Sequence, residues 1–440
     1  MTFLRFLPRS VKEALSLKRY DKTQKLFILD GAAINPALVL TSGIFLSGFI
    51  VYLGGSDFIV GLLNNSLAWA SMVALLSCLL FEKMKKRKAL IITFQFVSRI
   101  LVCSTIFLPL IIKDNNITLP IIIVMVILGN VLWSFYGTGV NVWMMEAVPK
   151  HSRKEFIYTR TFWLRITFTI FTIIMGYVLD WFNKNYTGFF IVFTISLVLS
   201  VTDTLILLRI EEPDNNVNVK SKVNFKRAFE PWKNPAYRGY LVFIFLFYLG
   251  LFTSASYTPL YLIKYLQMDY KFISFINVIA YIFMIVSVNF WSKIEWKKGI
   301  EYVLKVGALF IIAEFLIYGF VTSKTYYFLY FSPILAGIGN GGFNIAVLNY
   351  RYDIMPDNNK TIYEAWFGAV YGLGSMLAPI IGGYLLEHLP VIGNVIFQYG
   401  NFQLLYILSF VFDTILIFAY FGFNSTKRHI YSSNNKNLPC

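Results

Sequence analysis

Charged residues are scarce in this chain. Asp, Glu, Lys and Arg make up only 14% of its 440 residues, whereas hydrophobic types make up 57%. Soluble globular domains typically contain about 25% charged residues. The composition therefore excludes an ordinary soluble protein and indicates an integral membrane protein.

Cysteine and histidine are equally rare, with three of each. They are Cys78, Cys103, Cys440, His151, His388 and His429. The cysteines have neither a paired pattern nor metal-ligand spacing, and the histidines fall near predicted loops or the tail. No phosphate-binding glycine loop and no nucleophile with a nearby base is present. We therefore expect no enzymatic activity, no cofactor and no metal.

Long apolar runs dominate what is present. A helix needs roughly 20 apolar residues to cross the hydrocarbon layer, and backbone groups in lipid must bond within the segment. Twelve runs have such a length: 26–53, 57–81, 89–112, 119–145, 157–182, 187–210, 240–263, 272–292, 300–321, 326–350, 361–386 and 400–424. The expected fold is an all-α polytopic membrane protein with twelve transmembrane helices.

The net charge of +16 reflects topology. If the first run starts inside, most of the 39 Lys and Arg residues fall in inner loops. The outer loops then hold Lys113, Lys184, Lys264, Lys271 and Lys324. This positive-inside bias places both termini in the cytoplasm. It also explains the basic charge without nucleic acid, which we do not expect as a partner.

An internal repeat divides the chain. The sequence GYVLD at 176–180 recurs as GYLLE at 383–387, and VTDTLIL at 201–207 recurs as VFDTILI at 411–417. These matches predict two pseudo-symmetric six-helix bundles of parallel topology. The expected segments are an amphipathic cytoplasmic N-terminal segment at 1–25, bundles at 26–210 and 240–424, a cytoplasmic linker at 211–239 and a cytoplasmic tail at 425–440.

This organisation resembles the major facilitator superfamily over nearly the whole chain. The signature loop of that family lies between helices 2 and 3, where this chain reads CLLFEKMKKRK at 78–88. Glu82 stands at the acidic position, and Lys86 and Arg87 take the basic pair. Cys78 and Lys85 replace the two glycines. The resemblance implies alternating access between the two bundles, with the basic loop pairing with acids of neighbouring helices.

A second motif lies in the eleventh run. GLGSMLAPIIGG at 372–383 is similar to an antiporter motif that exporters of the superfamily carry in the fifth helix. The corresponding stretch of the fifth run, residues 163–180, has no proline. The small residues Gly374, Ala378 and Gly382 are spaced for close helix packing, which is the interpretation we favour.

Two aspartates occupy matched positions of the repeat. Asp203 and Asp413 lie within the sixth and twelfth runs, where a lipid-facing charge would be costly. By resemblance, helix 6 neighbours helix 3 and helix 12 neighbours helix 9. We therefore expect structural ion pairs of Asp203 with Arg99 and of Asp413 with Lys305. A proton-relay role is the alternative.

The resemblance places the substrate cavity between helices 1, 4, 7 and 10, to which Arg165 of helix 5 adds a mid-membrane charge. The polar and aromatic candidates for substrate contact are Arg165, Asn130, Trp133, Asn141, Asn340, Asn344 and Tyr257. Helix–helix hydrogen bonding of the asparagines, packing of the aromatics and a structural ion pair of Arg165 remain alternatives.

Four further acids suit coupling or gating. Asp30, Glu146 and Glu364 fall near the inner ends of their helices, and Glu82 lies in the signature loop. Loop salt bridges fit them best, although a desolvated Asp30 could also bind a proton.

The sequence thus predicts a secondary active transporter that exports a small amphiphilic compound by proton antiport. Proton-coupled uptake of a sugar, peptide or nucleoside is one alternative, and a lipid flippase or a non-transporting scaffold is another. The expected partners are the small-molecule substrate, the lipid bilayer and protons. We expect a monomer in the cell membrane, and the richness in Ile, Asn, Lys, Phe and Tyr suggests a bacterial source.

Overall fold

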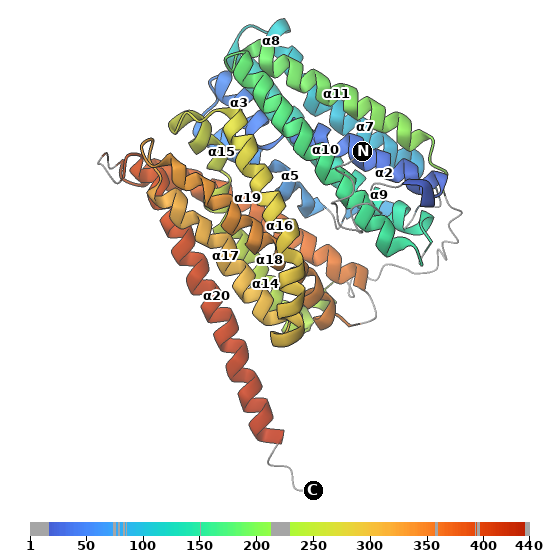
Figure 1. Ribbon diagram of the computed structural model, residues 1–440, viewed down its shortest axis with the longest axis vertical. Coiled ribbons are helices and arrows are strands. Elements are labelled where there is room, and N and C mark those ends of the chain that lie inside the picture. Colours follow the sequence, from blue (N-terminus) through green and yellow to red (C-terminus); the bar gives the residue numbers. More distant parts are fainter. Residues whose placement is uncertain are drawn as a thin grey trace, which may run out of the picture. The chain divides into compact units, whose positions relative to one another are not determined.

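The computed structural model describes residues 17–73, 76–77, 80–81, 84, 86–149, 151–212, 229–356, 360–391, 393 and 397–435. Within these ranges the regular structure is helical throughout, with no strand (Figure 1). The predicted all-α fold class is confirmed. The predicted amphipathic segment up to residue 16, Glu82 and most of the linker lie outside the described ranges.

The chain divides into two compact units. Unit 1 comprises residues 1–223 and 269–274, and unit 2 comprises residues 224–268 and 275–440. The division near residue 223 falls within the linker that the repeat indicates. The short segment 269–274 groups with unit 1 although it follows the seventh span, which the repeat did not predict.

Unit 1 is built around five long helices. Helix α2 packs on α10 and α11, and α7 packs on α9 and α11. The elements are η2 (Leu17–Arg19), α2 (Lys22–Val39), α3 (Gly43–Tyr52), α4 (Asp57–Asn64), α5 (Ser66–Trp69), η3 (Ala70–Val73), α7 (Lys88–Ser104), η4 (Thr105–Phe107), α8 (Leu108–Ile111), α9 (Asn115–Ala147), α10 (Arg153–Trp181) and α11 (Tyr186–Leu208).

In unit 2, α14 packs on α19 and α20, and α17 packs on α18 and α20. The elements are α13 (Glu230–Lys233), α14 (Pro235–Ala255), α15 (Thr258–Leu260), the π-helical turn η5 (Tyr261–Tyr265), α16 (Tyr270–Lys298), α17 (Ile300–Phe320), η6 (Tyr326–Tyr330), α18 (Ser332–Ile354), α19 (Lys360–His388) and α20 (Gly400–Asn435). Helix α20 continues past residue 424, where the sequence pattern ended it.

Eleven helical stretches of the described chain are long and apolar enough to cross a membrane. They match eleven of the twelve predicted runs. The second run, 57–81, contains the short pieces α4, α5 and η3. Asn65 interrupts it by closing α4 and preceding α5.

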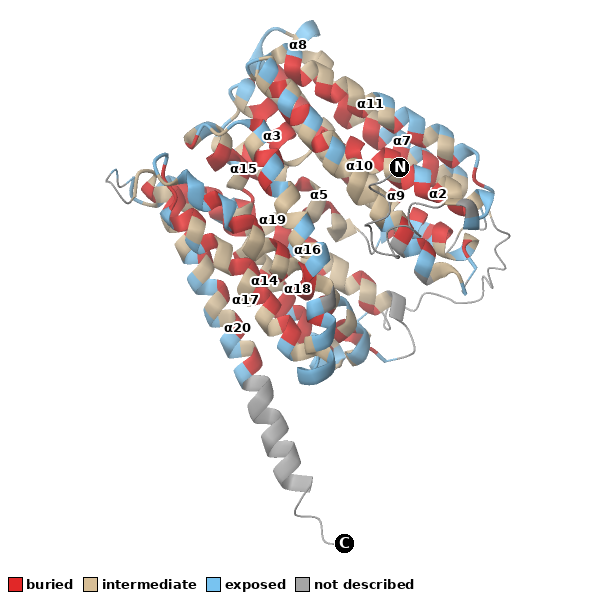
Figure 2. Cartoon of the chain, in the orientation of Figure 1, coloured by how far each residue is buried: buried red, intermediate tan, exposed pale blue. Residues whose placement is uncertain are grey.

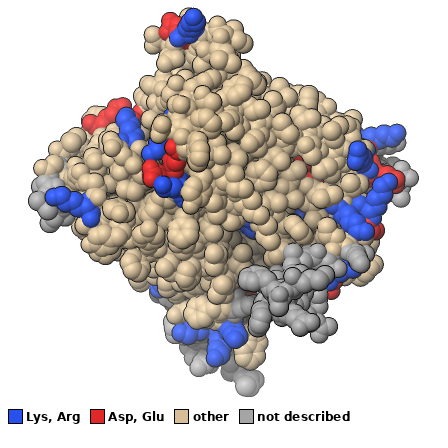
Figure 3. All heavy atoms as spheres, turned by 45° about the horizontal axis from the view of Figure 1, so that its top comes forward, with Lys and Arg blue, Asp and Glu red and all other residues tan. Residues whose placement is uncertain are grey.

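Apolar side chains cover much of the outer surface. Leu205, Ile285 and Ile415 are all exposed on long helices (Figure 2). On the face drawn in Figure 3, the described acidic and basic side chains gather in a few small groups. Such apolar exposure suits contact with lipid, because lipid replaces water around the helices.

The first span is broken near its middle. Pro36 lies in the last turns of α2, and Gly43 opens α3 with a φ of +51° after the turn at Thr41 and Ser42. A positive φ favours glycine, because it has no Cβ to clash with the backbone. The break leaves the Ala37 carbonyl to accept a hydrogen bond of 2.7 Å from Ser196 of α11.

Small residues allow close helix contact in unit 2. A Cβ on Gly374 or Gly382 would lie 2.9 Å from the Phe245 carbonyl oxygen or 2.2 Å from that of Thr253, both on α14. Ala378 between them is fully buried. The packing interpretation of the 372–383 motif is therefore confirmed.

Candidate functional site

A buried ion pair joins α2 to α10 in unit 1. Arg160 Nη2 lies 3.0 Å from Asp30 Oδ2, and the Asp30 side chain is fully buried. Arg160 Nε also donates to the Phe27 carbonyl oxygen at 3.1 Å. Tyr136 of α9 donates its hydroxyl to Asp30 Oδ1 at 3.2 Å. Two helices therefore contribute polar groups to a carboxylate that a third helix carries into an apolar interior.

Asp203 lies beside this pair. Its carboxyl group is fully buried and close enough to the Asp30 carboxyl to be repelled by it electrostatically. Gln95 donates to Asp203 Oδ2 at 2.8 Å, whereas Asp203 Oδ1 has no hydrogen-bond donor within the described chain. Two ionised carboxylates have no hydrogen to share and repel each other. Their mutual repulsion falls when one of them binds a proton.

Gln95 is held in place by its own partners. Thr204 donates to Gln95 Oε1 at 2.7 Å, so that the Gln95 amide group points towards Asp203. The same amide also donates to the Ser200 carbonyl oxygen at 3.1 Å. Asp203 thus receives an oriented neutral donor in place of a cation.

The predicted ion pair between Asp203 and Arg99 is wrong. The hydrogen bonds of Arg99 in the described chain go to the hydroxyls of Thr41 at 3.5 Å and Ser98 at 3.2 Å. Its guanidinium lies over the Trp133 ring, 4.7 Å from the centroid. The buried guanidinium of Arg99 stacks on the face of the Trp133 ring, which is a favourable cation–π geometry.

The predicted ion pair between Asp413 and Lys305 is also wrong. Lys305 Nζ lies 4.6 Å from the centroid of the Phe418 ring. Asp413 is fully buried, and neither of its carboxylate oxygens has a hydrogen-bond partner in the described structure. The matched aspartates of the repeat therefore have different surroundings.

The basic loop before α7 contacts the end of α9. Arg87 Nη1 lies 3.3 Å from Glu146 Oε1. Glu212, just after α11, accepts hydrogen bonds from the backbone N–H groups of Arg87 and Lys88, the latter at 3.0 Å. The structure thus brings the predicted gating acid Glu146 to the signature loop, whereas Glu82 of that loop is not described.

A related pair occurs in unit 2. Arg351 Nε lies 2.9 Å from Glu364 Oε1 and joins α18 to α19. The guanidinium carbon lies 3.7 Å from the centroid of the Phe367 ring. Glu364 is therefore held by a cation that is itself stacked on an aromatic ring.

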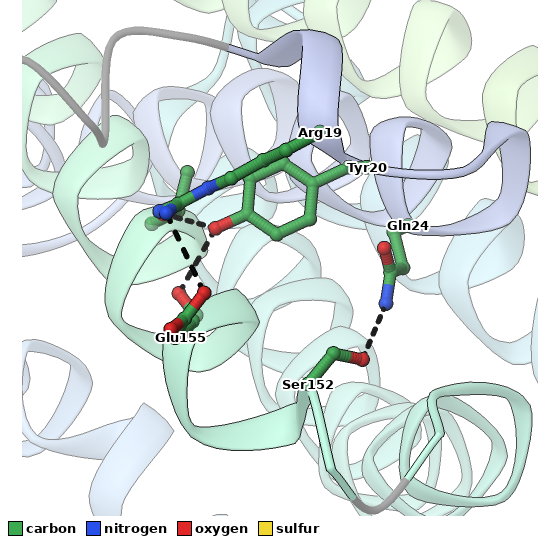
Figure 4. Close-up of polar contacts among 6 residues, drawn as sticks. Arg19, Tyr20, Gln24, Ser152 and Glu155 are labelled. Atoms are coloured by element: carbon green, nitrogen blue, oxygen red, sulfur yellow. Dashed lines mark hydrogen bonds and ion pairs between the residues drawn. The ribbon is translucent and has the colours of Figure 1, made fainter.

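The segment before α2 is fastened to α10 (Figure 4). Arg19 Nη1 lies 3.4 Å from Glu155 Oε2, and the hydroxyls of Tyr20 and Thr159 lie 2.7 Å apart. Gln24 donates to Ser152 at 3.0 Å and also closes a capping box with Asp21 at the start of α2. These contacts support the same pair of helices that Asp30 and Arg160 join.

The substrate candidates of unit 1 have different degrees of exposure. Asn141 is exposed on α9, and Arg165 is half-buried on α10. Asn130 is buried and donates to Ser66 at 2.7 Å. Trp133 lies beneath Arg99 and contacts Tyr136, with ring centroids 4.6 Å apart. The internal contacts of Asn130 and Trp133 suit the packing alternative.

The candidates of unit 2 divide in the same way. Asn344 is exposed on α18 and donates to Asn340 Oδ1 at 3.4 Å, while Asn340 donates to the Ala336 carbonyl oxygen at 2.9 Å. Tyr257 is fully buried and donates to the Pro379 carbonyl oxygen at 2.6 Å. Tyr257 therefore joins α19 to the turn that follows α14.

Three residues of the Asp30 site were missed. Arg160 falls about two turns inside α10 and at the start of the predicted run 157–182, where it was not singled out. Gln95 lies four residues before Arg99 and so on the same helix face, a signal that could have indicated it. Nothing in the sequence around Tyr136, apart from its place on α9, indicated that it would contact Asp30.

The arrangement gathers ionisable groups inside the first bundle. It contains two carboxyl groups, Arg160 in direct contact with one of them, and two neutral donors. Arg99 is also buried and acts on Asp203 electrostatically, without a direct contact. Intramembrane ionisable groups of this kind mark proton and ion pathways.

Comparison with curated proteins gives short matches. A 124-residue segment is 31% identical to a class H tetracycline resistance protein of Pasteurella multocida, covering 28% of this chain and 29% of that protein. A 111-residue segment is 29% identical to an uncharacterised membrane protein of Schizosaccharomyces pombe, covering 23% and 17%. The chain thus spans under a third of each relative.

Solved structures match over almost the full length. The nucleoside transporter NupG is 17% identical with a TM-score of 0.68, covering 91% of this chain and 98% of that chain. A D-xylose-proton symporter is 13% identical, with a TM-score of 0.63 and coverages of 89% and 96%. The POT family transporter PepTSo is 12% identical, with a TM-score of 0.69 and coverages of 93% and 99%. At these identities the likeness establishes the fold.

The model of the MFS_1 like family matches residues 45–429, which is most of the chain. The resemblance seen in the two six-helix halves and in the basic loop is confirmed. The chain is a multi-pass membrane transporter of the major facilitator type and belongs to the MFS_1 like family.

Proposed function

We propose that this protein exports a small amphiphilic compound in exchange for protons. The observation that carries the proposal is the buried carboxyl pair of Asp30 and Asp203, with Arg160 as counter-ion. Proton release leaves the Asp203 carboxylate without a direct ion-pair partner in an apolar interior, which is costly. That cost can be relieved by a change of conformation or by a bound substrate, and this couples proton movement to transport.

The export direction is supported by the segment that is similar to the class H tetracycline resistance protein. Aromatic and amide side chains dominate the substrate candidates, which suits an amphiphilic compound. We assign substrate contact to Arg165, Asn141 and Asn344, because these polar side chains are exposed or half-buried on the long helices. Asn130, Trp133, Asn340 and Tyr257 support them through internal contacts.

The remaining details of the proposal concern placement and assembly. The distribution of Lys and Arg favours cytoplasmic termini in a bacterial cell membrane. Glu146 and Glu364, each paired with an arginine, act as latches that are broken and remade in the transport cycle. Glu82 is assigned to the same latch as Glu146. The working unit is a monomer.

Proteoliposomes test the export proposal. The purified protein is reconstituted with a pH-sensitive dye inside, and a panel of drugs and metabolites is added under an imposed pH gradient. We expect one or more amphiphilic compounds to cause proton flux with the wild type. Asp30→Asn and Asp203→Asn should abolish that flux, whereas Asp353→Asn, at an exposed position, should preserve it. Compound-dependent flux that survives both buried substitutions would contradict the proposal.

Proton-coupled uptake of a polar nutrient is the second candidate. It is supported by the shared fold with NupG and with the D-xylose-proton symporter. The same liposomes separate the two, because uptake would give accumulation of a labelled nucleoside or sugar together with protons. Translocation of labelled lipid would instead indicate a flippase. A protein that moves neither solute nor lipid would be a scaffold.

A further inference from the structure

Asp413 is a buried carboxylate of unit 2 that the proposed proton coupling in unit 1 does not explain. Asp413 lies on α20, near the middle of the span 400–422. It is fully buried, and both of its oxygens lack a hydrogen-bond partner in the described structure. Its repeat mate Asp203 receives a hydrogen bond from Gln95 and faces Asp30. Asp413 therefore needs a partner of another kind.

The wall facing Asp413 is formed by α14. A Cβ on Gly250 would lie only 2.2 Å from Asp413 Oδ1, so the carboxylate occupies the space that a side chain would otherwise fill. Further along, the Tyr406 hydroxyl lies 2.9 Å from that of Thr258, at the start of α15. Residue numbers rise from Gly250 to Thr258 along one side of the contact and fall from Asp413 to Tyr406 along the other. The helices α14 and α20 therefore run antiparallel, with Gly250 level with Asp413.

That register places Ser254 opposite Ser409, one turn from Gly250 and Asp413. Both serines are buried, and both hydroxyl oxygens lack a hydrogen-bond partner in the described chain. This is unusual, because helical serines commonly donate to the carbonyl four residues earlier. Thr253 and Thr414 beside them do so, at 2.7 Å each. The two serines and the aspartate thus present four oxygens along one helix seam without bonding to each other.

Buried polar atoms are nearly always satisfied, so a group of four orphan oxygens requires an explanation. A cation explains all four at once, because it is coordinated by oxygen and holds its ligands farther apart than a direct hydrogen bond does. The charge indicates a monovalent ion. Calcium sites take 6–8 oxygens and several carboxylates, and magnesium requires near-octahedral geometry. This seam offers one carboxylate.

We propose that Asp413, Ser409 and Ser254 bind a sodium ion within unit 2, between α14 and α20. The site does not depend on the direction of transport or on the proton site of unit 1. The ion neutralises Asp413 and links the two helices. Ser254 and Ser409 contribute neutral ligands, and the absence of a side chain at Gly250 gives the carboxylate its place.

Thermal unfolding of the purified full chain tests the proposal. Melting is followed in detergent at constant ionic strength in sodium, lithium, potassium or choline chloride. An ion that binds only the folded state raises the melting temperature. We expect sodium at a hundred times its dissociation constant to raise the wild-type value by about 3 °C over choline. Asp413→Asn should abolish the rise, and Asp203→Asn, the matched control, should retain it.

The serines supply an independent test. Ser254→Ala and Ser409→Ala should each weaken sodium affinity by about tenfold, measured as the sodium concentration that gives half of the shift. Direct binding of radioactive sodium to the wild type, at one ion per chain, keeps the proposal testable if Asp413→Asn fails to fold. The proposal is overturned if the wild type melts equally in sodium and choline and binds no sodium. It is equally overturned if Asp413→Asn responds to sodium as the wild type does.

Discussion

Arg160 and Asp30 form an ion pair of 3.0 Å that joins α10 to α2 inside the first bundle. The pair is supported at one end by Tyr136 and at the other by the Phe27 carbonyl oxygen. A buried charge pair with satisfied neighbours is costly to break, because the remaining partner is left uncompensated.

Arg160→Ala should lower the free energy of unfolding by about 3–5 kcal/mol, since it leaves the Asp30 carboxylate buried without a cation. The double variant Asp30→Asn with Arg160→Ala should recover part of that loss. A double-mutant cycle of unfolding in detergent measures the coupling. Single losses that simply add in the double variant would show that the two residues do not act as a pair.

Asp203→Asn should fold with a change in unfolding free energy of about 1 kcal/mol or less, because the amide keeps an acceptor oxygen for Gln95 and removes a buried charge. Asparagine cannot bind or release a proton at physiological pH, so proton-driven transport should be lost while substrate exchange without a gradient continues. Paired assays of gradient-driven flux and counterflow in liposomes check this. Asp203→Leu, which leaves the Gln95 amide without its acceptor, should instead destabilise by about 1–3 kcal/mol.

Gly339→Ala should destabilise the contact between α18 and α17. Its Cβ would lie 2.7 Å from the Ile311 backbone nitrogen and 3.0 Å from the Gly307 carbonyl oxygen, and backbone atoms cannot rotate away. We expect a loss of about 1–3 kcal/mol, measured by thermal unfolding. Gly239→Ala is the control, because nothing lies within 4 Å of its added Cβ. An equal melting temperature for both variants would refute the close-packing argument.

Arg351→Lys should lower stability although the positive charge is kept. The planar guanidinium bonds Glu364 while it stacks on Phe367, and an ammonium cannot reproduce both contacts. The expected loss is about 1–2 kcal/mol. Introducing Phe367→Leu should cost less in the Arg351→Lys background than in the wild type, because the stack is already gone. Additive losses would argue against the stack.

Hydropathy and the repeat predicted the spans and the two halves, because both depend on properties that extend over many residues. Local interruptions were harder. The second run is apolar enough to span, yet Asn65 and a series of short helical turns divide its described part. Average hydropathy does not detect where a helix is interrupted. The division of this run into short helices could therefore not be predicted from its composition.

The pairing of buried charges was the weakest part of the prediction. Asp203 was correctly expected to contact helix 3, but its partner on that helix is Gln95 and not Arg99. Consecutive residues on a helix point about 100° apart, so a small rotation exchanges one partner for another. Ser254 illustrates the same limit. It forms no recognisable motif, and only the register of α14 and α20 places it one turn from Asp413.

Glu212 fixes the end of the first half of the chain to the start of α7. It follows α11, yet its carboxylate caps the first backbone N–H groups of α7, while Lys88 Nζ holds the Leu208 carbonyl oxygen at 2.8 Å. The chain is therefore fixed to the start of α7 at the point where the first half ends. An insertion or a reporter domain placed after residue 212 would lie beyond these contacts and leave them intact, which makes this junction a natural place to label the protein.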